Sequence, residues 1–441
     1  MKKSLHLSQM VNLNAGIFGI QFAWMLEVAN MTGIFSFFHA KPSSMGLFWL
    51  SLPVTGLFLQ GLVGFFSDRT YTVLGQRLPY IIIGSILTAI SLIWLPNSLS
   101  LMMVISLLWF FTAAVNIALQ PYRALVVDHV VYEQHTKIYA IQACLVGVGA
   151  TVASIMPWVF STIFHITAMS KNGIPLDIKF AFYMGSIVLI LTGLVTAVSS
   201  QRYFKLKEEN TTRAGESLKP ISLKDNLISL IRSHSAVKDI SFTQFLTWMG
   251  VFCFIVYLTL HIAQNVYGIP YDQHLLSEDK YAALMERSTV LTGICCAIYM
   301  AVSAIFSFII PYLTYFVSRK IILIIALAIG GFSLIIAGFS HSAILICTLM
   351  VGFGVAWASF NSIPYAIISN HAPKESMGFF MGMFNVFVCL PQIIVGVFIG
   401  KILETAFHHH AADIIILGGI FFLLAAVYAI KLKDTPRVML S

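Results

Sequence analysis

The sequence has little charge, and it lacks the residue sets that mark catalytic or metal centres. Only 10% of its 441 residues are charged, whereas 58% are hydrophobic. It contains no Ser/His/Asp set, phosphate-binding loop or CxxC zinc spacing, and its six cysteines all fall in apolar segments. We therefore expect neither an enzyme nor a resident cofactor, metal or disulfide framework.

Long apolar segments make up most of the chain. Its mean hydropathy is +0.87, and a membrane-spanning helix needs about 20 mostly apolar residues. The pattern predicts an all-α membrane protein with twelve transmembrane helices. We place them at approximately residues 11–38, 44–66, 78–97, 100–128, 137–165, 180–200, 239–266, 286–312, 319–339, 342–370, 376–404 and 411–431.

The longest polar stretch, residues 201–238, separates six apolar segments from the next six. It predicts a cytoplasmic linker between an N-terminal six-helix half, 1–200, and a C-terminal half, 239–441. A trace of an internal repeat supports two related halves, because Pro121-Tyr122 in the fourth segment is matched by Pro364-Tyr365 in the tenth.

The net charge of +8 follows the expected membrane topology and does not indicate a nucleic-acid partner. Cytoplasmic loops of membrane proteins are enriched in Lys and Arg. Arg123 lies within an apolar segment. If both termini are in the cytoplasm, most of the other basic residues are cytoplasmic. The exceptions on the outer side are Lys41, Lys171, Lys179, Lys280, Arg287 and Lys401. We expect a multi-pass protein of the cell membrane.

The first apolar segment carries polar residues at helical spacing. Gln21, Trp24 and Glu27 are three residues apart and form one row, and Asn30 follows one turn later. A carboxylate inside a membrane is costly, a Trp face stacks on a sugar ring, and amides bind hydroxyls. We expect these residues to line a substrate cavity. The alternative is a Trp and a Glu that contact neighbouring helices.

The fourth segment places Asn116, Gln120 and Arg123 on one helical stripe. Asp128 lies about 140° away from Arg123 around an ideal helix, so the spacing does not predict a direct pair, although Pro121 can kink the helix. Intramembrane charges usually lie on a solute or ion pathway. For Asp128 a place at the cytoplasmic membrane interface remains open.

The second half offers neutral polar groups. Trp357, Asn361 and Tyr365 share one stripe, and Asn385 and Gln392 share another. These groups suit a ligand rich in hydroxyls. We expect both halves to bind substrate, whereas coupling to an ion uses the charges of the first half.

Between the second and third segments lies a short charged loop that contains Asp68, Arg69 and Arg77. Glycines around it allow a tight turn, and Asp68 can cap a helix or pair with a basic residue. We expect this loop to act in gating at the cytoplasmic face. An ordinary charged turn is the alternative.

Two histidine features are candidate sites. His408-His409-His410 lacks nearby cysteines or carboxylates at ligand spacing, so we expect a solvated loop there. His261 is expected to be a hydrogen-bonded structural residue, with proton transfer as the alternative.

Taken together, these motifs resemble those of the sucrose–proton symporters of plants, their animal relatives, and the bacterial glycoside–pentoside–hexuronide:cation symporters, all of the major facilitator superfamily. The first segment resembles the family's Q-F-x-W-x-L. The fourth resembles its P-C-R-A-L-L-A-D. Further similarity lies at Pro53 to Pro79, at Ser362-Ile-Pro364-Tyr365-Ala366, and from Met381 to Gln392.

The resemblance implies proton-driven disaccharide uptake with Asp128 as the proton site. The chain departs from the plant pattern in two segments. Acidic residues of the seventh segment are replaced by Leu258 and Leu260, and the first segment has Glu27 in place of Gln. Glu27 is therefore expected to share the proton chemistry, together with Arg123.

We expect a monomeric carrier whose partners are a sugar, a proton and the lipid bilayer, working by alternating access. A sodium-coupled symporter, an efflux carrier and a non-transporting membrane sensor remain alternatives.

Overall fold

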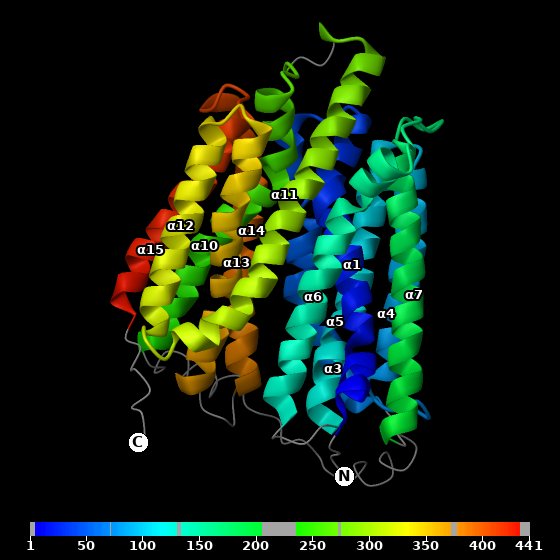
Figure 1. The fold of residues 1–441 in the computed structure, drawn as a ribbon, viewed down its shortest axis with the longest axis vertical. Helices are drawn as coiled ribbons and strands as arrows, with labels where there is room; N and C mark the ends of the chain where they lie inside the picture. Colours follow the sequence, from blue (N-terminus) through cyan, green and yellow to red (C-terminus); the bar gives the residue numbers. More distant parts are fainter. Residues whose placement is uncertain are drawn as a thin grey trace. The chain divides into compact units, whose positions relative to one another are not determined.

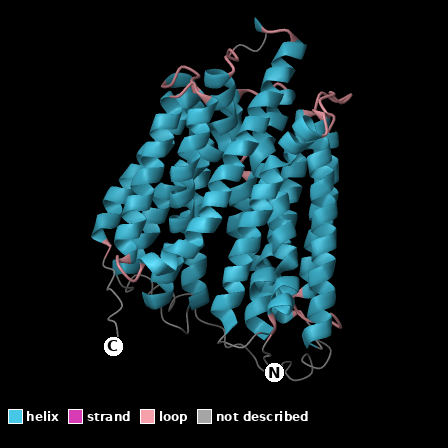
Figure 2. Cartoon of the chain, viewed as in Figure 1, coloured by secondary structure: helices cyan, strands magenta, loops and turns pink. Residues whose placement is uncertain are grey.

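The computed structural model describes residues 5–70, 72–129, 134–204, 235–271, 275–371 and 377–432. Within these ranges the side chains of Asp68, Arg123 and Asp128 are not described, and most of the predicted 201–238 linker lies outside them. The described residues form helices and loops with no strand (Figure 2).

The all-α membrane fold predicted from the sequence is confirmed. Twelve segments of the described chain are long and apolar enough to cross a membrane, and each centres on one long helix (Figure 1). These helices are α1 (Leu7–Phe37), α3 (Ser51–Arg69), α4 (Leu78–Trp94), α5 (Leu101–His129), α6 (His135–Trp158), α7 (Leu176–Phe204), α10 (Ser235–His261), α11 (Glu278–Leu313), α12 (Arg319–Phe339), α13 (Ala343–His371), α14 (Met377–Thr405) and α15 (Ala411–Tyr428).

The second span is not one continuous helix. A 3-10 turn at Pro42–Ser44 leads into the short α2 (Met45–Phe48), and α3 begins only at Ser51. Gly46 of α2 allows close packing against α14, because a Cβ at this position would lie only 2.7 Å from the carbonyl oxygen of Gly396 in α14. The break therefore lets the chain pass against the backbone of α14.

The chain forms two compact units. Unit 1 contains Met1–Lys41, Val54–Leu218 and Leu276–Ala297, and unit 2 contains Pro42–Pro53, Lys219–Leu275 and Ile298–Ser441. Each unit thus holds most of one predicted half together with a short segment from the other. The boundary between the units falls inside α3 and inside α11.

Each unit is built around one central helix. In unit 1, α1 packs against α6 and α7 and is the most buried of the spans, and in unit 2, α10 packs against α13, α14 and α15. Helices that are apolar on all sides are expected in such central positions. Functional groups on α1 or α10 therefore lie inside their unit and away from lipid.

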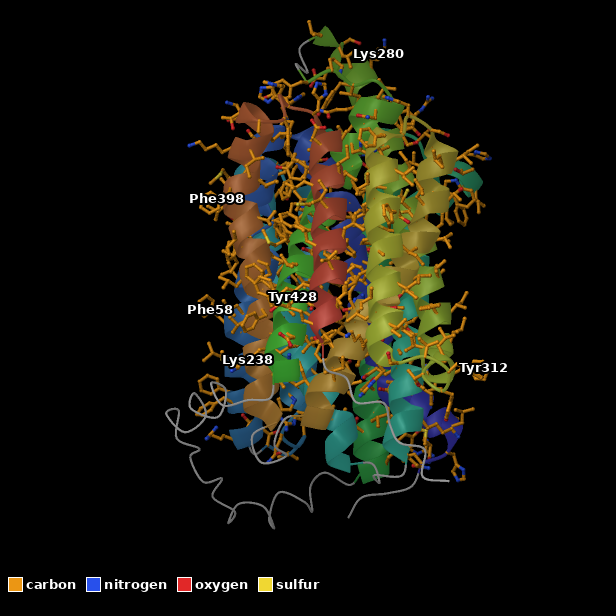
Figure 3. The ribbon with its side chains drawn as sticks, turned by 90° about the vertical axis from the view of Figure 1, so that its left-hand side faces the viewer. Phe58, Lys238, Lys280, Tyr312, Phe398 and Tyr428 are labelled. Atoms are coloured by element: carbon orange, nitrogen blue, oxygen red, sulfur yellow. The ribbon has the colours of Figure 1, made fainter. Side chains whose placement is uncertain are left out.

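The outer helices present apolar side chains to the surroundings. Phe58, Phe398 and Tyr312 project away from the ribbon (Figure 3), with exposed fractions of 61%, 58% and 63%. A lipid bilayer covers such surfaces in a spanning protein.

Candidate functional site

Glu27 is a carboxylate held inside unit 1. Its side chain is 0% exposed, and neither of its oxygens has a hydrogen-bond partner among the described residues. At 1.5 Å per residue it lies about 30 Å along α1 from Leu7 and about 15 Å from Phe37. Glu27 is therefore far from both ends of its helix.

The predicted row on α1 separates into two environments. Gln21 and Trp24 are half-buried, and their side chains make no hydrogen bond to the described residues. Asn30 is fully buried, donates from Nδ2 to the Leu26 carbonyl at 2.8 Å, and leaves its Oδ1 without a partner there. Gln21 and Trp24 remain accessible, whereas Glu27 and Asn30 are enclosed.

Asn116 and Gln120 on α5 are brought together by Gln60 of α3. Gln60 Nε2 donates to Asn116 Oδ1 at 2.9 Å, and Gln120 Nε2 donates to Gln60 Oε1 at 2.8 Å. Asn116 is 5% exposed, and the two glutamines are half-buried. The stripe predicted on α5 is thus part of a polar contact between two helices.

The helix α5 continues through Pro121 as far as His129. Arg123 and Asp128 lie on this helix, but their side chains are outside the description, so their roles stay predictions. The neighbouring Tyr122 is 1% exposed and lies so close to α1 that a Cβ on Gly16 would overlap its hydroxyl group. A glycine is needed at residue 16 for this contact.

The charged loop after α3 is held by local hydrogen bonds. Arg77 donates from Nη1 to Ser67 Oγ at 2.6 Å, and Gly75 makes the tight turn with a φ of 89°. Arg69 is exposed, and its guanidinium carbon lies 3.5 Å from the centre of the Phe65 ring. The Asp68 side chain is not described. The structure therefore shows an ordered turn and does not test its gating role.

In unit 2, Asn361 and Tyr365 of α13 and Asn385 of α14 are not fully enclosed. Asn361 is exposed and donates to the Trp357 carbonyl at 3.0 Å. Tyr365 is 41% exposed, and its ring meets that of Phe384 edge-on at 5.1 Å. The adjacent Asn385 is half-buried. Tyr365 and the region of Asn385 therefore lie close together, as a shared site requires.

Gln392 and Trp357 are more buried than Tyr365. Gln392 is 4% exposed and donates to the Val388 carbonyl of its own helix at 2.8 Å. Trp357 is 7% exposed and packs in an aromatic cluster with Trp248, Phe360 and Tyr299. Trp357 of the predicted stripe is therefore part of the packed core of unit 2.

Sequence analysis missed two glutamines that organise helix contacts. Gln60 joins Asn116 to Gln120, and Gln244 of α10 donates from Nε2 to the Phe360 carbonyl at 2.7 Å. Pro364 has no N–H to give that carbonyl, so Gln244 supplies the missing donor. Each is the one side-chain amide of its helix, which is the signal that the sequence offers for it.

His261 is hydrogen-bonded inside unit 2, and its structural role stays a prediction. It is 0% exposed, and its Nε2 lies 2.9 Å from the Ala337 carbonyl of α12. Around 408–410, His409 stacks on the ring of Tyr271 at 3.7 Å. Burial raises the pKa of Tyr271, and the negative charge of Glu404 raises it further. Within the described residues, no group of three or more His, Cys, Asp or Glu side chains is arranged to hold a metal ion.

Sequence comparison matches the chain to the Major Facilitator Superfamily over residues 13–396 and again over 287–439. The chain therefore belongs to this superfamily.

Among curated proteins, the chain is 24% identical to the "General alpha-glucoside permease" of Schizosaccharomyces pombe over 62% of its own length and 50% of the permease. The match thus spans half the length of that relative. It is 23% identical to the "Sucrose transport protein SUT5" of Oryza sativa subsp. indica over 93% of its own length and 85% of that protein.

Solved structures share the fold. The nucleoside transporter NupG superposes with a TM-score of 0.68 at 14% identity, covering 97% of this chain and 100% of NupG. An inward-facing bacterial homologue of the lysosomal transporter Spinster gives a TM-score of 0.67 at 13% identity, covering 97% of both chains. These likenesses concern the fold alone.

Proposed function

We propose that this protein is a secondary active transporter that works by alternating access. It carries a sugar, which is a disaccharide or a glucoside, together with a proton. The observation that carries the proposal is Glu27, a fully buried carboxylate with no partner in the described chain. A transporter fold and a carboxylate suited to proton binding together fit a proton-coupled carrier.

Proton binding follows from the cost of charge in this environment. An unpaired ion inside an apolar interior costs several kcal/mol, whereas a protonated carboxyl group carries no net charge. Glu27 is enclosed in unit 1, so its side chain is more stable with a proton bound. It releases the proton when water reaches it. Asp128 and Arg123 are proposed as its coupling partners from their family resemblance.

The sugar is supported by the relatives and by the chemistry of the accessible side chains. The relatives are named for sucrose and alpha-glucosides. Half-buried Gln21 and Gln120 offer amides, and half-buried Trp24 offers an aromatic face. Amides and aromatic faces together bind sugars, because hydroxyl groups pair with amides while the apolar ring face stacks.

The orientation is proposed from the distribution of basic residues. With both termini and the 201–238 linker in the cytoplasm, most Lys and Arg residues lie on the cytoplasmic side. With this orientation, we propose that the protein works in the cell membrane as a monomeric importer.

Uptake into proteoliposomes tests the proposal. Radiolabelled sucrose and maltose are offered under an imposed inward pH gradient, under an inward sodium gradient, and with neither. We expect accumulation only with the pH gradient. Accumulation that follows sodium alone would favour the sodium-coupled alternative, and uptake of neither sugar under any gradient would contradict the proposed substrate class.

A matched pair of variants connects the result to Glu27. Glu27→Gln retains shape and most hydrogen bonding but cannot ionise, whereas Glu278→Gln makes the same change at an exposed position. We expect Glu27→Gln to abolish pH-driven accumulation or to flatten its pH dependence, and Glu278→Gln to leave both unchanged. An unchanged pH profile in Glu27→Gln would leave Asp128 as the only proposed acidic proton carrier.

A further inference from the structure

The side-chain amides of α3 and α5 form a chain of hydrogen bonds with a defined starting point. Asn116 Nδ2 donates to the backbone carbonyl of Thr112 at 2.8 Å and to Thr55 Oγ1 at 3.2 Å. Asn116 Oδ1 then accepts from Gln60, and Gln60 Oε1 accepts from Gln120 at 2.8 Å. All four side chains belong to unit 1.

The direction of this chain is fixed by chemistry at its buried end. A backbone carbonyl can only accept, so the amide of Asn116 must turn its nitrogen toward Thr112. Its oxygen is then left for Gln60, which must approach with its nitrogen. Gln60 in turn presents its oxygen, and only the nitrogen of Gln120 can satisfy that oxygen. Each amide orientation determines the next.

The open end of the chain is an acceptor. Gln120 is half-buried, and its Oε1 has no hydrogen-bond partner among the described residues. An isolated glutamine can flip its amide and present either a donor or an acceptor. Gln120 cannot do so without breaking its bond to Gln60. Its Oε1 therefore stays in one position as an acceptor, and the second N–H of Nε2 remains as a donor beside it.

We infer that Gln60 is a positioning residue that holds Gln120 in one amide orientation, so that unit 1 recognises a ligand hydroxyl group that donates its proton to Gln120 Oε1. The inference rests on the proposed function, since it assumes a hydroxyl-bearing ligand, and it adds a selection rule for that ligand. A hydroxyl group is preferred over a fluorine or a methoxy group at the same ring position, because neither of these can donate.

Binding competition with sugar analogues tests the rule. Unlabelled deoxyfluoro analogues of the transported sugar, one for each hydroxyl position, compete with uptake of the labelled parent sugar. In the wild-type protein we expect at least one position where fluorine weakens competition about tenfold, which corresponds to one lost hydrogen bond. Gln120→Met should remove that penalty.

Variants of Gln60 separate positioning from direct contact. Gln60→Glu keeps an acceptor for Gln120 Nε2 and should retain the fluorine penalty. Gln60→Met removes the acceptor, frees the amide of Gln120 to rotate, and should reduce the penalty to about twofold or less. Should Gln60→Met fail to fold, Gln60→Lys makes the same test, because an ammonium group only donates and would turn the amide around.

Gln142→Met is the matched control. Gln142 of α6 also joins two helices of unit 1 through a hydrogen bond between side-chain amides, from its Nε2 to Asn14 Oδ1 at 3.4 Å, but it lies outside the α3–α5 chain. It should leave the fluorine penalty unchanged.

The outcomes distinguish the two proposals. If the wild-type protein takes up neither sucrose nor maltose, the proposed function fails and this inference fails with it. If it takes up sugar but Gln60→Met keeps the full penalty, or Gln120→Met does not change it, the positioning role of Gln60 is wrong while the transport function stands.

Discussion

Replacing Glu27 by methionine should stabilise the protein while it removes proton coupling. Both carboxylate oxygens are buried without a partner in the described chain. Methionine has a similar length and flexibility, and its side chain has no strong polar group to satisfy. Glu27→Met therefore removes two desolvated oxygens with little change in packing.

The size of the effect follows from the cost of an unsatisfied buried polar group, which is about 1–3 kcal/mol. Because Glu27 is 0% exposed, no solvent contact offsets this cost. We expect the free energy of unfolding to rise by about 1–3 kcal/mol in Glu27→Met. Glu27→Gln should gain less, because an amide in the same place still has unsatisfied polar atoms.

The native cysteines provide the assay. Cys253, Cys295, Cys296 and Cys389 are buried, so a dye that fluoresces on reaction with thiols reports unfolding of the detergent-solubilised protein on heating. The control Glu404→Met changes the same residue type at an exposed position, where shifts are usually within about 0.5 kcal/mol. A lower unfolding midpoint in Glu27→Met than in Glu404→Met would refute the reasoning, because it would mean that Glu27 makes a stabilising interaction.

Four further outcomes are expected. Asp128→Asn should abolish accumulation driven by a pH gradient in proteoliposomes while sugar counterflow persists, and full accumulation would contradict its coupling role. Arg123→Ala should reduce uptake more than Arg123→Lys, since only arginine provides a planar fork of donors; unchanged sugar affinity and rate in Arg123→Ala would make Arg123 structural. Gly16→Ala should lower the unfolding free energy by about 1–3 kcal/mol, because its Cβ would overlap the Tyr122 hydroxyl group, as thiol-dye melting measures. Ser217→Cys should resist a membrane-impermeant thiol reagent added outside intact cells, with a cysteine in an outer loop as the labelled control.

The spans were predictable from the sequence because hydropathy measures the same property that the bilayer selects. The third, ninth and twelfth spans have the predicted bounds of 78–97, 319–339 and 411–431. The largest error is at α11, which begins at Glu278 and not near residue 286. Glu278 and Asp279 lie in its first turn, where acidic residues favour the helix dipole, so the helix extends into a polar segment that hydropathy does not count.

The candidate site was predictable only within single helices. Helical spacing correctly placed Asn116 and Gln120 on one stripe, since that depends only on the repeat of one helix. It contained no information on which neighbouring helix meets that stripe, so Gln60 was not identified. The same limit applies to α1, where spacing grouped Glu27 with Gln21 and Trp24 although packing encloses only Glu27.

The repeated Pro-Tyr dipeptide shows how one sequence feature acquires two roles. In each case the proline cannot donate to the carbonyl four residues earlier. In unit 2, beside Pro364-Tyr365, Gln244 donates to that carbonyl of Phe360 at 2.7 Å, and the tyrosine stays 41% exposed. In unit 1, at Pro121-Tyr122, the tyrosine is buried against Gly16. The repeat therefore leaves a backbone carbonyl without its usual N–H donor in both helices. Packing against the neighbouring helix determines whether the tyrosine is exposed.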